Sequence, residues 1–163
     1  MAGSGVHFAI SEETVSRLLA AEDDADVISI VGQIETELEP AFVFSTDDAW
    51  DALHRCLTNG TLKPDSGVFP LSHVVLGGVQ LCEDQGYLVS LVRADQVSAV
   101  ADALTPIDRA WLRARYDGSD FPGYARPRGD EDFEYTWGHV NGIGGFFQAA
   151  ADDGRAVIFT VEL

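Results

Sequence analysis

Three of the four histidines are candidates for proton transfer. His54 lies in the helical pattern "DDAWDALHRCLTNG", His73 follows Ser72, and His139 lies in the aromatic segment "FEYTWGHVNGIGGFF". Imidazole changes its charge near neutral pH, so each of the three is a candidate general acid or base. For His54, a packed and hydrogen-bonded core histidine is the alternative. No two histidines have the spacing with which a helix chelates a metal ion.

Arginines gather in the second half of the chain, close to aromatic residues. A planar guanidinium group binds a carboxylate or phosphate through two hydrogen bonds at once, so this region suits an anionic small molecule. The alternative is that these arginines only pair with the many acidic residues. The candidate pocket residues are His54, His73, Arg113, Tyr124, Arg126, Tyr135, Trp137 and His139.

No motif in the chain names a reaction. The sequence has no phosphate-binding glycine loop with its lysine, no nucleophile elbow, no paired-histidine zinc motif and no calcium loop. We therefore expect no cofactor and no metal ion, and the sequence leaves the catalytic residues, if any, unknown.

The aromatic segment reads as part of a helix over residues 130–152. At the helical repeat, Phe133 and Phe147 lie on one side and Tyr135 and His139 on the other. A helix that is apolar almost all round belongs in the core, and its glycines allow a backbone or a ligand to approach closely. The pattern predicts a buried aromatic helix. A pocket lined by Tyr135 and His139 is the alternative.

Acidic residues dominate the composition. The chain has 27 Asp and Glu against 10 Lys and Arg, a formal net charge of −17 and a pI near 4.2. Such a surface repels nucleic acid and anionic membranes, so neither is an expected partner. Between Met1 and His54 the only Lys or Arg is Arg17. The candidate residues for docking a basic protein partner are Glu22, Asp23, Asp24, Asp26, Glu35, Glu37 and Glu39.

Hydrophobic periodicity predicts an α+β fold. We expect a single compact domain over residues 5–163, with a short flexible segment at residues 1–4. It combines a small mixed or antiparallel sheet of about four strands with about six helices. The predicted strands cover residues 6–10, 73–81, 87–92 and 155–163, with a hairpin turn at "EDQG". The predicted helices cover residues 12–21, 27–38, 47–58 (capped by Ser45 or Thr46), 93–104, 106–116 (begun by Pro106) and 130–152.

The two cysteines and the hydropathy bear on the compartment. Cys56 and Cys82 read as buried free thiols, which is typical of a reducing environment. No apolar run approaches the length that spans a bilayer. We therefore expect a cytoplasmic protein.

Several stretches of the sequence carry a family resemblance: "GVHFAIS", "DDAWDALHRCLTNG", "PLSHVVLGGVQL", the "YLVSLV…DQV" passage and the closing "FEYTW…FFQAAADDGRAVIFTVE". They cover nearly the whole chain from Gly5. In these stretches the chain resembles the YfbM-like family of small bacterial proteins of unknown function. The resemblance implies a compact α+β domain in a bacterial cytoplasm, and it carries no established activity or catalytic residues.

Two functions remain open on these observations. The leading one is a non-catalytic interaction protein whose acidic N-terminal half docks a basic partner, as an inhibitor or immunity protein does. The other is a small-ligand binder or an enzyme with an aromatic, histidine and arginine pocket for an anionic small molecule.

Overall fold

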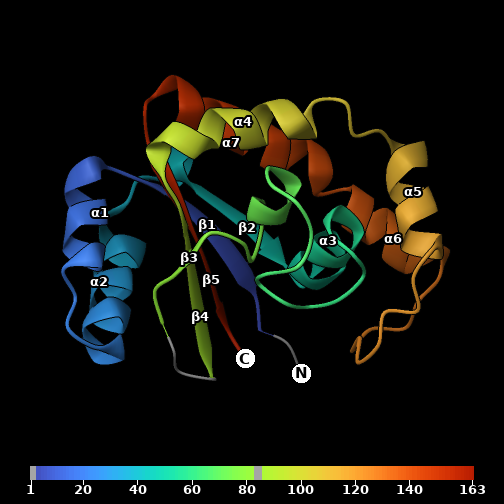
Figure 1. Ribbon diagram of the computed structural model, residues 1–163, viewed down its shortest axis with the longest axis horizontal. Coiled ribbons are helices and arrows are strands. Elements are labelled where there is room, and N and C mark those ends of the chain that lie inside the picture. The colour runs from blue at the N-terminus through green and yellow to red at the C-terminus, as the bar shows by residue number, and fades with distance from the viewer. Residues whose placement is uncertain (1–2, 83–85) are drawn as a thin grey trace.

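The computed structural model describes residues 3–82 and 86–163, which form one antiparallel sheet flanked by helices (Figure 1). The strand order is β2-β1-β5-β4-β3, and each neighbouring pair is antiparallel. The α+β prediction is confirmed. The strands are β1 (Gly5–Ile10), β2 (Val43–Asp47), β3 (Val79–Gln80), β4 (Tyr87–Val92) and β5 (Ala156–Glu162).

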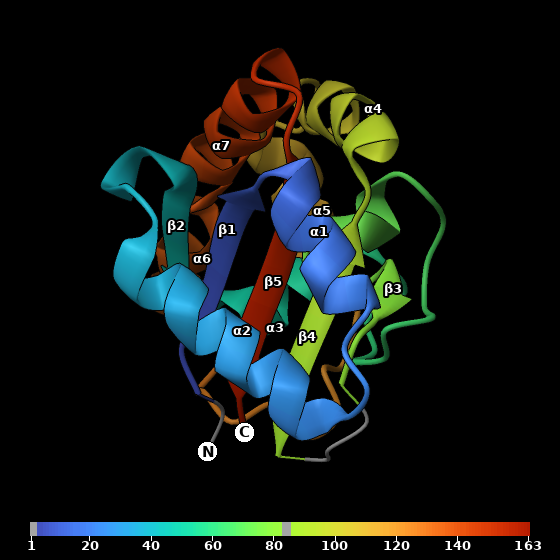
Figure 2. The ribbon, with the colours of Figure 1, turned by 90° about the vertical axis from the view of Figure 1, so that its left-hand side faces the viewer.

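Helices lie on both faces of the sheet. α1 and α2 cover one face, and the other α-helices pack on the opposite face and beyond it (Figure 2). The helices are α1 (Glu12–Leu19), α2 (Asp24–Glu37), α3 (Ala49–Leu57), α4 (Ala94–Leu104), α5 (Arg109–Asp117), α6 (Asp130–Trp137) and α7 (Val140–Asp152), with short 3-10 helices η1 (Pro40–Phe42) and η2 (Leu71–His73).

The central strand β5 joins two hydrophobic cores. Its residues are buried from Ala156 to Val161. Val157 and Phe159 belong to the core shared with α3 to α7, whereas Ile158 belongs to the core under α1 and α2. Successive strand side chains point to opposite faces, so one strand supplies both cores. Because both faces of β5 are buried, the strand is apolar at almost every position.

The chain ahead of β1 is tied to neighbouring elements. Residues 1 and 2 of the expected flexible segment lie outside the described residues. The Gly3 carbonyl accepts a hydrogen bond from Trp50 Nε1 at 2.8 Å, and Ser4 Oγ donates to Asp47 Oδ1 at 2.7 Å. These contacts attach the start of the chain to β2 and α3.

Side-chain caps set the starts of several helices. Ser11 Oγ accepts a hydrogen bond from the Thr14 backbone N–H at 3.3 Å, so the predicted cap of α1 is confirmed. The predicted start of α5 at Pro106 is wrong. α5 begins at Arg109, because the Asp108 carboxylate caps its first turn.

The predicted cap of the third helix is also wrong. Ser45 and Thr46 belong to strand β2, which pairs with β1, and α3 begins after Asp48. Thr46 Oγ1 donates to the Gly5 carbonyl at 3.1 Å, which ties β2 to β1. A five-residue edge strand of this kind depends on a partner that is distant in sequence, and local pattern therefore misses it.

The strand predicted over residues 73–81 is reduced to Val79–Gln80. The preceding run forms η2 and a turn, in which the Gly77 N–H donates to the Ser72 carbonyl and Gly78 has a φ of 104°. This run is apolar because Val74 to Leu76 are buried in the core. The turn expected at "EDQG" falls largely on residues 83–85, outside the described residues.

The helix predicted over residues 130–152 is divided into α6 and α7. Gly138 and His139 separate them, and α7 runs without a break through the later glycines. Phe133 and Phe147 are fully buried, as expected for an aromatic core element. The close approach expected at the glycines occurs at Gly142, where an added Cβ would lie 2.6 Å from the Phe44 ring.

Candidate functional site

Four of the eight candidate pocket residues come together at the junction of α6 with β2. Tyr124, Arg126, Tyr135 and His139 meet there through ring and hydrogen-bond contacts. Arg113 lies nearby on α5 and reaches the first residue of α6. The remaining three residues lie in other parts of the molecule.

A buried carboxylate that sequence reasoning missed lies at the centre of this group. Asp132 is 4% exposed and accepts hydrogen bonds from Tyr116 Oη at 2.7 Å, Tyr124 Oη at 2.9 Å and Arg126 Nε at 2.7 Å. Burial, and then the bond to Asp132, raises the pKa of Tyr124. Both tyrosine hydroxyls therefore stay protonated and act as donors to the carboxylate.

The same cluster reaches strand β2 through Arg126 and Tyr135. The Arg126 guanidinium lies 4.3 Å from the centroid of the Tyr135 ring, and its Nη1 is 3.4 Å from Asp48 Oδ2. Tyr135 Oη donates to Asp47 Oδ2 at 3.0 Å. Hydrogen bonds from Ser4 and then from Tyr135 lower the pKa of Asp47. These contacts join β2 to α6.

A cavity of about 380 Å³ opens beside this cluster at the start of α6. Arg126 and Arg128 line it, but both guanidinium groups already have partners. Arg128 Nη1 donates to the Ser119 carbonyl at 2.6 Å, and Nη2 donates to the Tyr116 carbonyl. The other lining residues are Pro127, Gly129, Asp130, Glu131, Asp132 and Tyr135. Three carboxylates in the lining oppose the binding of an anion.

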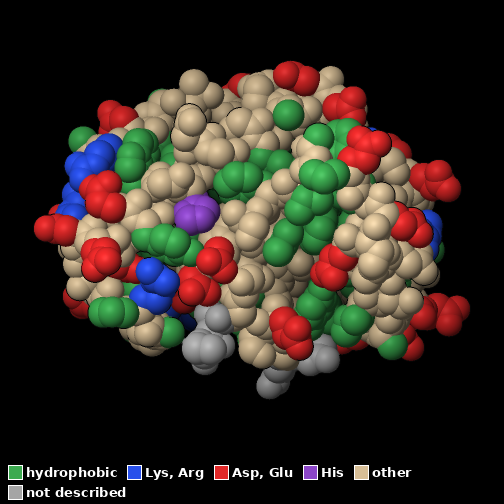
Figure 3. All heavy atoms as spheres, turned by 180° about the vertical axis from the view of Figure 1, so that it is seen from behind, with side chains coloured by type: hydrophobic (Ala, Val, Ile, Leu, Met, Phe, Trp, Pro, Cys, Tyr) green, Lys and Arg blue, Asp and Glu red, His purple; other side chains and the backbone are tan. Residues whose placement is uncertain are grey.

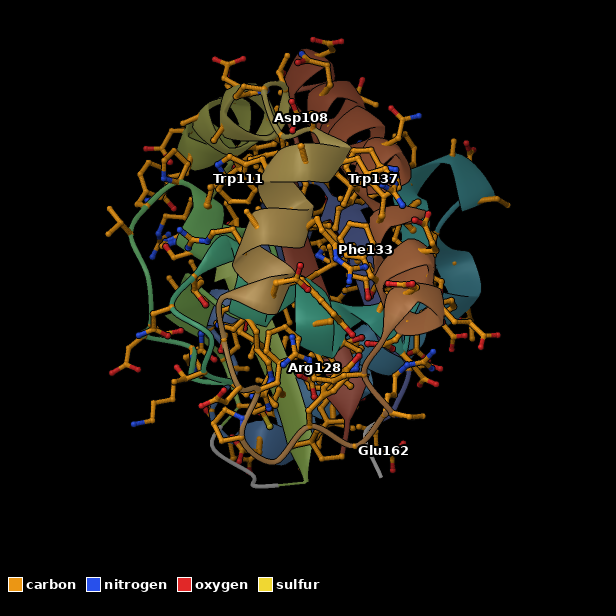
Figure 4. All side chains as sticks on the ribbon, turned by 90° about the vertical axis from the view of Figure 1, so that its right-hand side faces the viewer. Asp108, Trp111, Arg128, Phe133, Trp137 and Glu162 are labelled. Atoms are coloured by element: carbon orange, nitrogen blue, oxygen red, sulfur yellow. The ribbon has the colours of Figure 1, made fainter. Side chains whose placement is uncertain are left out.

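Arg113 and Phe133 show how the arginines of this end are used. Arg113 forms ion pairs with Asp117 and Asp130, each at 3.0 Å, and its guanidinium lies 4.9 Å from the centroid of the Phe133 ring. Figure 4 shows Phe133 between α5 and α6, with Arg128 in the connecting segment. The arginines here cover an aromatic core and pair with acids of the same chain.

His54 and His73 do not share this site. His54 is 1% exposed, and its Nε2 lies 2.8 Å from the Lys63 carbonyl and 3.2 Å from Ser66 Oγ. Burial lowers its pKa to about 4, so it is a neutral, packed core residue. His73 Nδ1 lies 2.9 Å from Ser72 Oγ, and burial lowers its pKa as well.

Trp137 lies in a separate groove between α4 and α7. This groove has a volume of about 440 Å³ and is mostly apolar, with Leu104, Ile107 and Val140 beside the indole ring. Figure 4 shows Trp137 on the α6 side of the molecule, at the level of Trp111 and away from Arg128. It therefore contributes nothing to the Asp132 cluster.

The acidic docking candidates lie at the two ends of α2. Glu22 and Asp23 precede it, Asp24 and Asp26 occupy its first turn, and Glu35, Glu37 and Glu39 lie at its end or just beyond. All are exposed except Asp24, which is half-buried.

The two acidic groups differ in what they do for the helix. The Asp23 carboxylate caps α2 by accepting from the Asp26 N–H at 2.9 Å, and acids suit the positive end of a helix dipole. The last turn of α2 carries Glu35 and Glu37 and no basic residue. Acids at that end oppose the dipole. Helix stability therefore explains the first group and not the second.

A groove also lies beside the first acidic group. It is an open groove of about 760 Å³ between the α1–α2 connection and strand β3. Figure 2 shows this connection running beside β3. The lining residues are Leu18, Leu19, Ala21, Glu22, Asp23, Asp24, Ala25, Val27, Gln80 and Leu81.

Charge is not confined to one flank of the molecule. Figure 3 shows Asp and Glu side chains over the whole of the face opposite that of Figure 1, while most of its Lys and Arg atoms lie towards the edge that carries α5 and α6. The ion pairs of the described residues involve Arg55, Arg109, Arg113, Arg126 and Arg155, and none of them includes Glu22, Asp23, Asp26, Glu35, Glu37 or Glu39. Those six exposed acids of the α1–α2 flank therefore have no ion pair among the described residues.

Among residues 3–82 and 86–163, no group of His, Cys, Asp and Glu side chains has the arrangement of a metal site. No helix there combines the length and the apolar character needed to cross a membrane.

Comparison with known proteins places the chain in a family. The crystal structure of YfbM from Escherichia coli, a protein of unknown function, matches with a TM-score of 0.72 and 20% sequence identity, over 99% of each chain. At that identity the match shows the fold alone. No curated protein matches the chain. The model of a family described as a domain of unknown function, DUF1877, matches residues 1–160. The chain therefore belongs to the DUF1877 family, and its fold is that of YfbM.

Proposed function

We propose that this protein is a non-catalytic interaction protein that docks a basic protein partner through the α1–α2 flank. The observation that carries the proposal is the set of exposed carboxylates of Glu35, Glu37 and Glu39. They lie where they oppose the helix dipole, and no ion pair of the described residues includes them. Residues that cost stability and remain solvated suit a role in binding.

Electrostatics defines the kind of partner. Exposed charges chiefly raise the rate of association and add less to the strength of the final complex. A basic inhibitor target or a toxin-like protein with a cationic surface fits such a flank. The acids near the start of α2, Glu22, Asp23, Asp24 and Asp26, extend the same field along the helix.

The alternative function, binding of an anionic small molecule, has less support. Its candidate residues divide among separate places, and Arg126 is already paired with Asp132 and Asp48. The cavity beside them carries acidic side chains of its own. A ligand there would have to displace ion pairs that the chain makes internally.

Association kinetics test the proposal. A partner is first identified by affinity capture, and its association rate is then measured at low salt. The variant Glu35→Lys/Glu37→Lys should associate about ten-fold more slowly or worse, and physiological salt should narrow the difference. The matched variant Asp95→Lys/Asp102→Lys makes the same change in net charge at exposed positions on α4.

The α4 variant distinguishes an effect of charge on the α1–α2 flank from an effect of the net charge of the protein. If docking uses the α1–α2 flank, the α4 variant slows association much less than the α2 variant. Equal slowing by both variants, or no slowing by either, would remove the support for docking through this flank.

A further inference from the structure

The groove beside the α1–α2 connection has an apolar floor. Leu18 and Val27 form its buried base, with 2% and 3% of their surfaces exposed. Leu19 and Leu81 line it at the surface, and Leu19 is 44% exposed. The rest of α1 packs into the core. That packing does not explain why Leu19, on the same short helix, is so exposed.

The rim of the groove is polar and negatively charged. Glu22, Asp23 and Asp24 line it on the helix side, and Gln80 lines it on the side of strand β3. Glu22 is exposed at the point where the chain leaves α1 and enters α2. Carboxylates within reach of an apolar surface attract a cation that also carries an aliphatic chain.

We propose that this groove seats a segment of the basic partner in which a lysine or arginine adjoins an aliphatic side chain. The aliphatic group packs between Leu19 and Leu81, and the cation meets the carboxylates of Glu22 and Asp23. The inference rests on the proposed function and adds the site and the recognition chemistry to it. In this arrangement the groove anchors the bound partner, and the acids at the far end of α2 increase the rate at which the partner approaches.

Charge complementarity selects this occupant over others. A second copy of the chain carries the same net charge of −17, so its approach to an acidic rim is repelled. Nucleic acid and anionic lipid are repelled in the same way. A purely apolar segment would leave the carboxylates of Glu22 and Asp23 without a counter-charge.

Binding of defined peptides tests the site. The labelled full-length chain is titrated with a synthetic peptide of alternating lysine and leucine, and amide shifts are followed by NMR. A lysine–serine peptide of equal charge and a glutamate–leucine peptide serve as comparisons. We expect the lysine–leucine peptide to shift the amides of residues 18–27 and 80–81, and to bind at least about ten-fold more tightly than the lysine–serine peptide.

Matched variants separate the anchor from the general field. Leu19→Gln removes an apolar wall of the groove, whereas Ile28→Gln changes a similarly exposed side chain, 39% against 44%, that does not line it. Leu19→Gln should abolish most of the preference for leucine, and Ile28→Gln should leave it intact. Thermal unfolding of each variant checks that its fold is retained.

The outcomes distinguish this inference from the proposed function. Shifts confined to residues 35–39, or equal binding of the lysine–leucine and lysine–serine peptides, would overturn the groove as an anchor and leave docking to the α1–α2 flank standing. Failure of every basic peptide to bind would count against both. Binding of the glutamate–leucine peptide at the groove would also overturn the inference, because it would show a site indifferent to charge.

Discussion

At the scale of single residues, His7 is the most constrained ionisable group of the described chain. It is fully buried in β1, its Nε2 donates to the Val74 carbonyl at 2.7 Å, and its Nδ1 has no hydrogen-bond partner. Phe146, Phe147 and Phe159 surround the ring at centroid distances of 6.1, 5.8 and 4.8 Å. The site accepts a neutral imidazole and excludes an imidazolium.

His7 therefore makes the fold sensitive to acid. Burial lowers its pKa from 6.5 to about 4, so the unfolded chain binds the proton more readily. The stability that the neutral His7 contributes to the fold is fully present above pH 6.5 and is lost as the pH falls from 6.5 towards 4. Between pH 7.5 and pH 5 we expect His7 to account for a loss of about 2 kcal/mol in the free energy of unfolding, measured by urea denaturation.

A variant isolates this effect from the titration of the carboxylates. His7→Gln cannot take up a proton, so its loss of stability between the two pH values should be smaller than that of the wild type by the same amount. His54, whose pKa is also lowered to about 4, remains in both proteins and cancels. Identical losses in the two proteins would contradict the assignment.

Asp132 is the second residue whose environment makes a quantitative prediction. Asp132→Ala would leave the hydroxyls of Tyr116 and Tyr124 and the guanidinium of Arg126 without their acceptor. Removing one partner of a buried charged group costs about 3–5 kcal/mol. Tyr124→Phe removes one donor and should cost about 1 kcal/mol. Chemical denaturation measures both, and equal effects would show that the carboxylate is not the centre of the cluster.

At the scale of elements, the glycines of α7 have opposite roles. A Cβ at Gly145 would meet nothing within 4 Å, whereas a Cβ at Gly142 would lie 2.6 Å from the Phe44 ring. Gly145→Ala should therefore stabilise the protein by about 0.5–1 kcal/mol, through better helix propensity. Gly142→Ala should destabilise it by about 1–3 kcal/mol, because β2 must move. Thermal unfolding of the two variants compares them, and a gain in both would refute the β2 contact.

The elements that the sequence predicts well are those whose pattern is local. β1, β4, β5 and the helices α1, α2 and α4 follow from alternation, helical spacing and capping residues. β2 depends on pairing with β1, and the apolar run before β3 is buried without being a strand. The break at Gly138 separates α6, which packs on α3 and α5, from α7, which packs on α4. These features belong to tertiary structure, which local periodicity does not contain.

The candidate sites show the same limit. The acids of α2 and the arginines were visible in the sequence as charged residues. Nothing in the sequence distinguishes Asp132 from the acids next to it, because the tyrosines that bind it lie 16 and 8 residues away. The groove combines α1, α2 and β3, so only the folded chain brings Leu19 next to Leu81.

At the scale of the whole molecule, the two ends differ in how their charged side chains are paired. At the end that carries α5 and α6, Arg109, Arg113 and Arg126 are paired with acids of the same chain. At the end that carries α1 and α2, Arg17 donates to the Gln33 side chain, and no ion pair of the described residues includes Glu35, Glu37 or Glu39. With a net charge of −17, the folded chain repels itself most at this end, where Arg17 is the only Lys or Arg of the two helices.

This asymmetry predicts that the acids of the proposed docking surface lower the free energy of unfolding. Glu35→Lys/Glu37→Lys places cations at the negative end of the α2 dipole and makes the net charge less negative, so it should raise the free energy of unfolding by about 0.5–2 kcal/mol at low salt. Asp95→Lys/Asp102→Lys changes the net charge equally but removes an acid from the first turn of α4, where it suits the dipole. It should give a smaller gain or a loss. Urea denaturation at low and high salt measures both. A loss of stability in the α2 variant would show that its acids serve the fold, and binding would no longer be needed to explain them.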